Sequence, residues 1–203
     1  MKILMLAAMF SVSVQMPAST RQAAVALQNS RVRIYRTVAG EVGGIGHGPG
    51  VVVWLQDGPL GKAGRAIWLD DVAAPPPKGV DNAPTVIVQL LASASSSAST
   101  PPTGSTPGDA PSTGMSFNAL FENAHVSVLR ARMDVGAREG FHTHASDTIV
   151  VHLSGGQIED TADGKTIVNR WKPGDVEFEA RGSSHSARNL SHAVDVVLVV
   201  LKH

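Results

Sequence analysis

Turn-forming residues divide the last part of the chain into short apolar runs, and this spacing most constrains the fold. Between residues 126 and 202, the turn signals are Gly155-Gly156, Asp163-Gly164 and Pro173-Gly174-Asp175. The runs between them predict strands at 126–133, 148–154, 166–171, 176–180 and 193–202. Short strands at even spacing predict an all-β domain, either an antiparallel barrel or a sandwich.

The front of the chain carries a similar set of apolar runs in the same order. LQNSRVRIYRTVAGEVGGIGH (27–47) parallels FENAHVSVLRARMDVGAREGFH (121–142), VVVWLQDG (51–58) parallels IVVHLSGG (149–156), and TVIVQLL (85–91) parallels DVVLVVLK (195–202). Three ordered blocks favour an internal repeat over a chance likeness of β-rich segments. We therefore expect a smaller β-unit over 27–91 that packs against a related unit over 115–203.

Residues 92–114, ASASSSASTPPTGSTPGDAPSTG, contain no large aliphatic or aromatic side chain. Such a segment buries too little surface to offset the entropy lost on ordering, so it is predicted to be a flexible linker between the two units.

The N-terminus has the layout of a secretory signal peptide. One lysine precedes the apolar run 3–14, which is too short for a stable membrane anchor, and small residues follow. We place the signal at 1–20, ending near Ala18-Ser19-Thr20, although Ala24-Val25-Ala26 would extend it to 26. The prediction is a secreted or periplasmic protein, and the absence of cysteine excludes disulfides and a thiol nucleophile.

The charge balance argues against a polyanionic partner. The chain has 17 Lys plus Arg and 17 Asp plus Glu, which gives a formal net charge of zero. Nothing in this balance creates a basic field for nucleic acid or an anionic membrane surface. We expect a small-molecule partner, no nucleic acid and no membrane after processing, and a homodimer is left open.

Two histidines one residue apart stand in GAREGFHTHASDTIVVHLSGG (136–156). Strand side chains alternate faces, so His142 and His144 point to one side. A barrel interior is normally apolar, and a divalent metal ion would satisfy both imidazoles at once. A third ligand must then come from elsewhere, and the candidate is His185 in GDVEFEARGSSHSARN (174–189).

These two segments resemble the paired motifs of the cupin superfamily of small β-barrels. The first family motif, G-x5-H-x-H-x3,4-E-x6-G, is matched by Gly136, His142, His144 and Gly155. The second, G-x5-P-x-G-x2-H-x3-N, is matched with every spacing intact by Gly174, Gly182, His185 and Asn189, and Ala180 replaces the proline. The resemblance covers most of residues 122–202. It implies an RmlC-like double-stranded β-barrel of the jelly-roll type, with the front unit as the degenerate copy of a bicupin.

The glutamate ligand of the first motif is missing. Its place is taken by Thr148 or Ile149. Asp147 is one residue out of phase, so in a regular strand it faces away from His144, and only a bulge would bring it into the site as a fourth ligand. His152 has the parity of His144 but lies eight residues further on, which at about 3.3 Å per residue is too far for one coordination sphere. We interpret His152 as supporting the site, binding a partner or facing solvent. The expected metal ligands are His142, His144 and His185, with water or substrate completing the set.

Three neutral imidazoles leave a divalent ion its full charge and open positions. This suits an anionic chelating substrate or the generation of hydroxide from bound water. Such ligands admit iron, zinc, nickel, manganese or copper. Cupins with three-histidine sites include iron dioxygenases, so the resemblance implies a secreted metal-dependent oxygenase acting on a small oxygenated molecule. The alternatives are a non-catalytic cupin that binds a small ligand, with or without metal, and a structural barrel whose histidines are relics.

Other polar residues give weaker expectations. Arg138 and Arg181 flank the two motifs, where one of them could clamp a substrate carboxylate. In the front unit His47 is expected in a loop, and Asn82 of PPPKGVDN (75–82) is where a histidine of the second motif would be. Phe178 is expected in the core.

Overall fold

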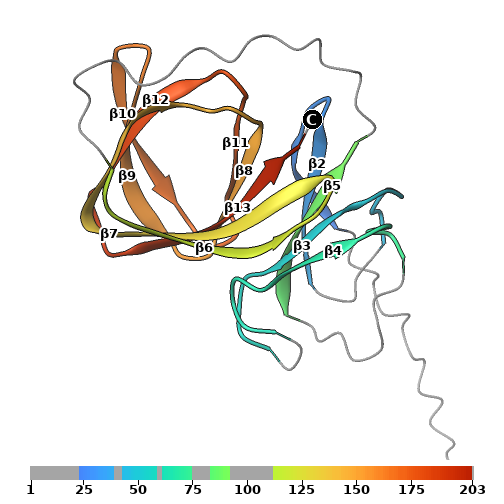
Figure 1. Ribbon diagram of the computed structural model, residues 1–203. Helices are drawn as coiled ribbons and strands as arrows, with labels where there is room; N and C mark the ends of the chain where they lie inside the picture. The colour runs from blue at the N-terminus through green and yellow to red at the C-terminus, as the bar shows by residue number, and fades with distance from the viewer. Residues whose placement is uncertain (1–22, 39–42, 59–60, 75–82, 92–111, 203) are drawn as a thin grey trace, which may run out of the picture.

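The computed structural model describes residues 23–38, 43–58, 61–74, 83–91 and 112–202. These ranges form two antiparallel sheets and are all-β, as the sequence predicts (Figure 1). Within them, no helix has the length and apolar character needed to cross a membrane. The predicted signal peptide, residues 92–111 of the predicted linker and Asn82 lie outside the described residues.

The front of the chain forms the smaller sheet, in the order β1-β2-β5-β3-β4. Its strands are β1 (Ala24–Gln28), β2 (Val32–Val38), β3 (Gly50–Trp54), β4 (Ala66–Leu69) and β5 (Pro84–Leu90). The back forms a curled sheet in the order β10-β9-β12-β7-β13-β8-β11, with β6 paired to β7. Its strands are β6 (Thr113–Glu122), β7 (Val126–Thr143), β8 (Thr148–His152), β9 (Gly156–Ala162), β10 (Lys165–Trp171), β11 (Val176–Glu179), β12 (Ser184–Asn189) and β13 (Val194–Leu201).

The two sheets share a topology that supports the internal repeat. β2, β5 and β3 are neighbours in that order, and so are β7, β13 and β8, the strands with matching sequence blocks. The outer strands correspond as well, because β1 pairs with β2 as β6 does with β7, and β4 pairs with β3 as β11 does with β8. β9, β10 and β12 have no counterpart in the described part of the smaller sheet. They complete the curl of the larger sheet around an interior (Figure 1).

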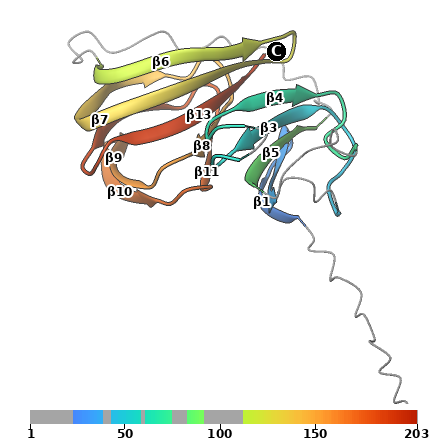
Figure 2. The same cartoon turned by 90° about the horizontal axis from the view of Figure 1, so that it is seen from below.

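One apolar core joins the two sheets, which lie side by side in Figure 2. Alternate residues of β2, β3 and β5 meet their equivalents on β7, β8 and β13. The buried members are Val32, Ile34, Val51, Val53, Val86, Val88, Val126, Val128, Ile149, Val151, Val197, Val199 and Leu201. Phe178 packs against this core, as expected. The opposite face of β7, β8 and β13 is therefore left to line the interior of the barrel sheet.

The sequence did not predict β1 and β4 of the smaller sheet, or β6, β9 and β12 of the larger one. β9 (GQIEDTA) and β12 (SHSARN) are largely polar, so they lack the apolar alternation used to find strands. β6 begins at Thr113, inside the segment that composition predicts as linker. β7 continues beyond the predicted end at Met133 because Gly136 adopts φ 74°, a left-handed conformation that lets the strand bend and carry on to the histidines.

Candidate metal centre

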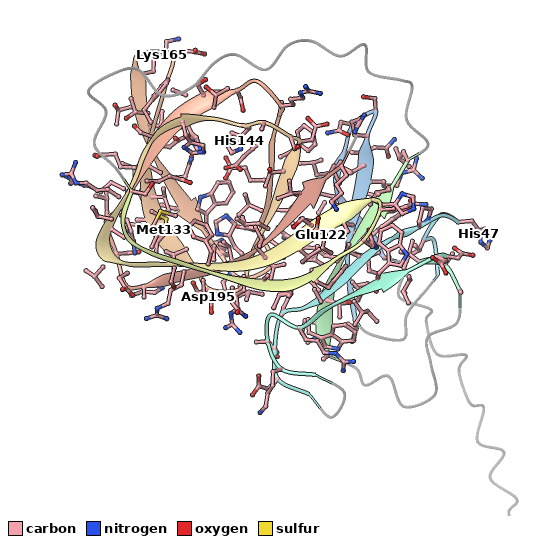
Figure 3. All side chains as sticks on the ribbon, in the orientation of Figure 1. His47, Glu122, Met133, His144, Lys165 and Asp195 are labelled. Atoms are coloured by element: carbon pink, nitrogen blue, oxygen red, sulfur yellow. The ribbon has the colours of Figure 1, made fainter. Side chains whose placement is uncertain are left out.

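The structure brings the three predicted histidines together inside the curl of the sheet. His142 lies near the end of β7 and is paired with His185 of β12, and His144 follows β7 directly. One ring nitrogen from each histidine lies within 4.8 Å of the other two, and the Nε2 atoms of His144 and His185 are 3.1 Å apart. Figure 3 shows His144 inside the ring of strands, whereas Lys165 and Asp195 project outward.

Backbone ties hold this arrangement in place. The His144 N–H donates to the Ser183 carbonyl at 2.9 Å, and the Gly182 N–H donates to the His144 carbonyl at 2.8 Å. Gly182 has φ 84°, which explains the glycine of the second motif. Asn189 is 1% exposed, and its Nδ2 donates to the carbonyls of Met133, Asp134 and His192. The motif asparagine therefore fastens the end of β12 to β7 and does not line the site.

The histidines are oriented as metal ligands. His142 Nδ1 lies 3.0 Å from the carbonyl oxygen of Gly140, which only accepts, so this nitrogen donates and Nε2 keeps its lone pair. His185 Nδ1 lies 3.0 Å from Asp160 Oδ1, the carboxylate partner that commonly orients a metal-bound histidine. Two nitrogens each about 2.1 Å from one ion are roughly 3.0–3.4 Å apart, and the 3.1 Å separation of two Nε2 atoms meets this requirement. The residues fit a divalent ion.

Burial keeps His144 available as a ligand. Desolvation, helped by the neighbouring His142 and His185, lowers the pKa of His144 to about 4. The imidazole is therefore neutral over the physiological range, and a metal ligand must be deprotonated. The side chain of His142 is 33% exposed, those of His144 and His185 are 11% and 16% exposed, and the cluster is thus reachable from solvent.

Two carboxylates that the motifs did not indicate lie beside the three histidines. Glu179 of β11 places its carboxylate 3.6 Å from His144 Nε2 and 3.9 Å from His185 Nε2. Glu139 of β7 places its carboxylate 3.7 Å from His142 Nε2 and 4.0 Å from His185 Nε2. These two acids lie beside the three histidines, close enough for a small movement to bring either of them to a bound ion.

Asp147 does not join the site, as its strand phase predicts. Its side chain is paired with Arg31 of the smaller sheet at 3.3 Å and accepts a hydrogen bond from the Arg181 N–H at 2.8 Å. Thr148, at one of the two positions open to the family glutamate, lines the interior instead. The missing ligand is therefore not restored by a bulge at Asp147.

Local features of β7 and β11 explain why the sequence did not identify Glu139, Glu177 and Glu179 as residues of the site. His142 lies opposite His185 and Glu139 opposite Ala187, so β7 has one extra residue between them, a bulge that turns Glu139 to the side of His142. On β11, Phe178 packs against the core shared with the smaller sheet, which turns Glu177 and Glu179 inward. In the sequence alone, alternating acids on a strand are more typical of a solvated face.

Burial and mutual repulsion raise the pKa values of both β11 carboxyls. Desolvation, followed by repulsion from Asp160 and Glu139, raises the pKa of Glu177 to about 7. Desolvation, followed by Glu177, Glu139 and Asp160, raises the pKa of Glu179 to about 8. A cluster of acids in one enclosed space favours a cation there and opposes an anion.

A cavity of about 250 Å³ extends from the histidines into the sheet. Its walls combine the histidines and four acids with apolar side chains from β6, β7, β8, β9 and β13. No lysine or arginine of the described residues lines it. Arg138 lies at a different surface pocket and Arg181 beside Asp147, so the expected carboxylate clamp is wrong, and the acids oppose the anionic substrate that it would have held.

His152 also lines this cavity, at its other end. It is 3% exposed and stacks on Trp171 with ring centroids 4.5 Å apart, so the alternative that it faces solvent is wrong. His47, by contrast, is exposed beside Asp71, at the edge of the smaller sheet (Figure 3), as expected for a loop residue.

No protein-family model and no curated protein matches the chain. Its structural neighbours include cupins. A cupin domain from Bordetella pertussis Tohama I is 22% identical, with 44% of this chain and 95% of that chain covered at a TM-score of 0.42. An RmlC-like cupin from Shewanella frigidimarina is 19% identical, with 44% and 78% covered at a TM-score of 0.38.

A third neighbour is a cupin superfamily protein from Desulfitobacterium hafniense DCB-2. It is 17% identical, with 46% of this chain and 83% of that chain covered at a TM-score of 0.38. The likeness concerns the curled sheet. The cupin fold of this chain follows from its own geometry, in which both motifs are placed around one interior with their histidines converging.

Proposed function

We propose that this cupin-fold protein binds one divalent transition-metal ion through His142, His144 and His185 and takes a small organic molecule into the adjoining cavity. The observation that carries the proposal is the convergence of three ring nitrogens within 4.8 Å, two of them fixed from behind by Gly140 and Asp160. Iron, zinc, nickel, manganese and copper all suit imidazole ligands.

The bound ion would supply positive charge and open positions for a ligand oxygen. The chain's own contribution is the cavity, which is lined in part by apolar side chains, and the carboxyl of Glu179. That carboxyl lies 3.6 Å from His144 Nε2, where its raised pKa of about 8 suits proton exchange with a ligand oxygen held at the histidines. A proton-exchanging group at this position favours an enzyme, and we propose an oxygenase acting on a small oxygenated molecule, with a non-catalytic ligand-binding protein as the alternative.

Export is part of the proposal. It is supported by the lysine and the apolar run of residues 3–14, followed by small residues. Mass spectrometry of protein recovered from the medium or periplasm, showing a new N-terminus between residues 18 and 27, is the expected result. Intact protein found only in the cytoplasm would contradict it.

Metal content tests the site directly. Purified protein is stripped with a chelator, reconstituted in turn with iron, zinc, nickel, manganese and copper, and analysed for bound metal. We expect about one equivalent of at least one metal in the wild type and in His47→Ala, and a large loss in His185→Ala, because two ligands on one strand cannot complete the set. Retention of none of the metals by the wild type would end the metal-site proposal.

Turnover separates the enzyme from the binding protein. Glu179→Gln keeps the size of the side chain and removes its ability to exchange a proton. In oxygen-consumption assays with catechols and diketones, we expect turnover by the loaded wild type and a loss of at least about a hundredfold in Glu179→Gln at equal metal content. Metal-loaded wild type that binds these compounds without consuming oxygen would favour the non-catalytic function.

A further inference from the structure

His152 is a buried polar side chain whose hydrogen-bonding groups are unused. It is 3% exposed, and neither Nδ1 nor Nε2 has a hydrogen-bond partner among the described residues. Its backbone N–H donates to the Asp175 carbonyl at 3.0 Å, but the ring takes no part in that bond. Burying polar atoms without partners is unfavourable, and such exceptions in folded proteins call for a cause.

The strand register places His152 far from the three histidines. On β8, Thr148 is paired with Glu179, beside the histidines, and His152 is paired with Val196. Four residues of strand separate Thr148 from His152, a distance of about 13 Å. Because Thr148, Val150 and His152 all line the cavity, the cavity runs along this face of β8 from the histidine cluster to a buried end at His152.

The buried end is otherwise apolar. Trp171 covers one face of the His152 ring, with the two planes 17° apart. Ile158 and Val194 are buried there, and Trp171 and Val196 pack against them. A ligand that reaches this end therefore needs an apolar body, and the imidazole offers it a buried polar partner without competing hydrogen bonds. Asn169, which is paired with Ile158, also lines the cavity.

The protonation state of His152 and the acids of the cavity limit which polar group of a ligand could bind at this end. Burial lowers the pKa of His152 to about 4, so near neutral pH the ring is uncharged and has one N–H and one lone pair. A hydroxyl group can donate to the ring's lone pair or accept from its N–H, so it can pair with whichever nitrogen faces the cavity, whereas a carboxylate or an ether can only accept. The four acids that line the cavity further disfavour an anion.

We propose that the His152–Trp171 end of the cavity binds the hydroxyl group of a neutral, mainly apolar ligand such as a phenol. This inference rests on the proposed function for the other end of the ligand, which would reach the three histidines. The hydroxyl contact itself needs no metal and so stands or falls separately.

The test uses chelator-treated, metal-free full-length protein and three probes of similar shape. Para-propylphenol can donate and accept, para-propylanisole only accepts, and para-propylbenzoate is an anion. We expect calorimetry to give an affinity for the phenol about tenfold higher than for the anisole, as one satisfied hydrogen bond provides, and the weakest binding for the benzoate. Equal affinities for phenol and anisole, or tightest binding of the benzoate, would overturn the proposal.

Variants test whether His152 causes the preference for the phenol over the anisole. His152→Leu should bind both neutral probes equally, and His152→Gln, which can still donate and accept, should keep part of the preference. His47→Leu, at an exposed position outside the cavity, should keep all of it. A phenol preference that survives in His152→Leu would contradict the proposal. If His152→Leu does not fold, ¹⁵N NMR of the wild-type histidine rings decides. The His152 nitrogens should shift with the phenol and not with the anisole, and unmoved signals would contradict the proposal.

Reconstitution of the same protein with metal keeps the two hypotheses apart. A phenol preference in a protein that takes up none of the five metals on reconstitution would refute the metal site and leave the hydroxyl contact intact. A protein that binds metal but shows no phenol preference would support the metal site and refute the hydroxyl contact.

Discussion

His185 and Asp160 are joined by a 3.0 Å contact between Nδ1 and Oδ1 across β12 and β9. The contact leaves the Nε2 lone pair of His185 directed at the other two histidines. Because His185 is the one ligand outside the His142–His144 segment, its orientation decides whether three nitrogens or two are available to an ion. The acid is thus part of the proposed metal site, where it would orient a ligand without touching the ion.

Removing this support should weaken metal binding while the three ligands remain. Asp160→Ala is expected to lower metal affinity about 10- to 100-fold, the usual cost of losing a carboxylate behind a ligating histidine. Competition with a chelator of known affinity measures it. Glu159→Ala is the matched control, because Glu159 is the adjacent acid and pairs with Arg188 outside the cavity. Equal affinities in the two variants would show that Asp160 does not orient His185.

For Asp147, unlike Asp160, we expect a substitution to change stability and not metal binding. Asp147→Asn should leave metal content unchanged, because its carboxylate faces Arg31 and not the histidines. It should lower the free energy of unfolding by about 1–3 kcal/mol, because the half-buried Arg31 loses its charged partner. Elemental analysis and denaturant unfolding measure the two effects. A loss of metal with stability unchanged would make Asp147 a ligand after all.

The three-histidine cluster and the internal repeat could be predicted from the sequence, because both depend on local residue patterns. The spacings around His142, His144 and His185 are fixed by strand alternation and by a glycine turn, and such local geometry is visible in the residues themselves. The repeat was visible as well, because buried strands of the shared core, such as β3 and β8, are continuous apolar runs.

The parts that could not be predicted depend on contacts between distant segments. Glu177 and Glu179 face inward only because Phe178 packs on the core shared with the smaller sheet. Glu139 lies beside the three histidines because of a bulge in β7, and no residue in the sequence indicates that bulge. His152 and Trp171 belong to different strands, so their stacking emerges only when β8 and β10 close the cavity.

Burial of His152 should also appear in the pH dependence of stability. The unfolded chain protonates His152 near its ordinary pKa of 6.5, whereas the folded protein does so only near 4. Between these values the unfolded state binds more protons, so His152 adds no protonation penalty above pH 6.5 and destabilises the fold increasingly as the pH falls towards 4. The full penalty is about 3 kcal/mol.

Denaturant unfolding of metal-free protein at several pH values between 4 and 7 measures this contribution. His152→Leu should lose less stability on acidification than the wild type, because it has no imidazole to protonate. It should also be at least as stable near pH 7, because a buried apolar side chain replaces unsatisfied polar atoms. Parallel curves for the two proteins would mean that His152 finds a partner in the folded state.

The core shared by the two sheets should make them unfold as one unit. Val51 and Ile149 occupy equivalent positions of the repeat and are both fully buried in that core. Ile149→Ala removes buried methyl groups there and should lower the free energy of unfolding by about 2–5 kcal/mol. Ile167→Ala, the same change at a position that is 56% exposed on β10, should cost less than about 0.5 kcal/mol. Fluorescence and circular dichroism should report one coincident transition, and the appearance of a second transition in the wild type would show that each sheet is stable without the other.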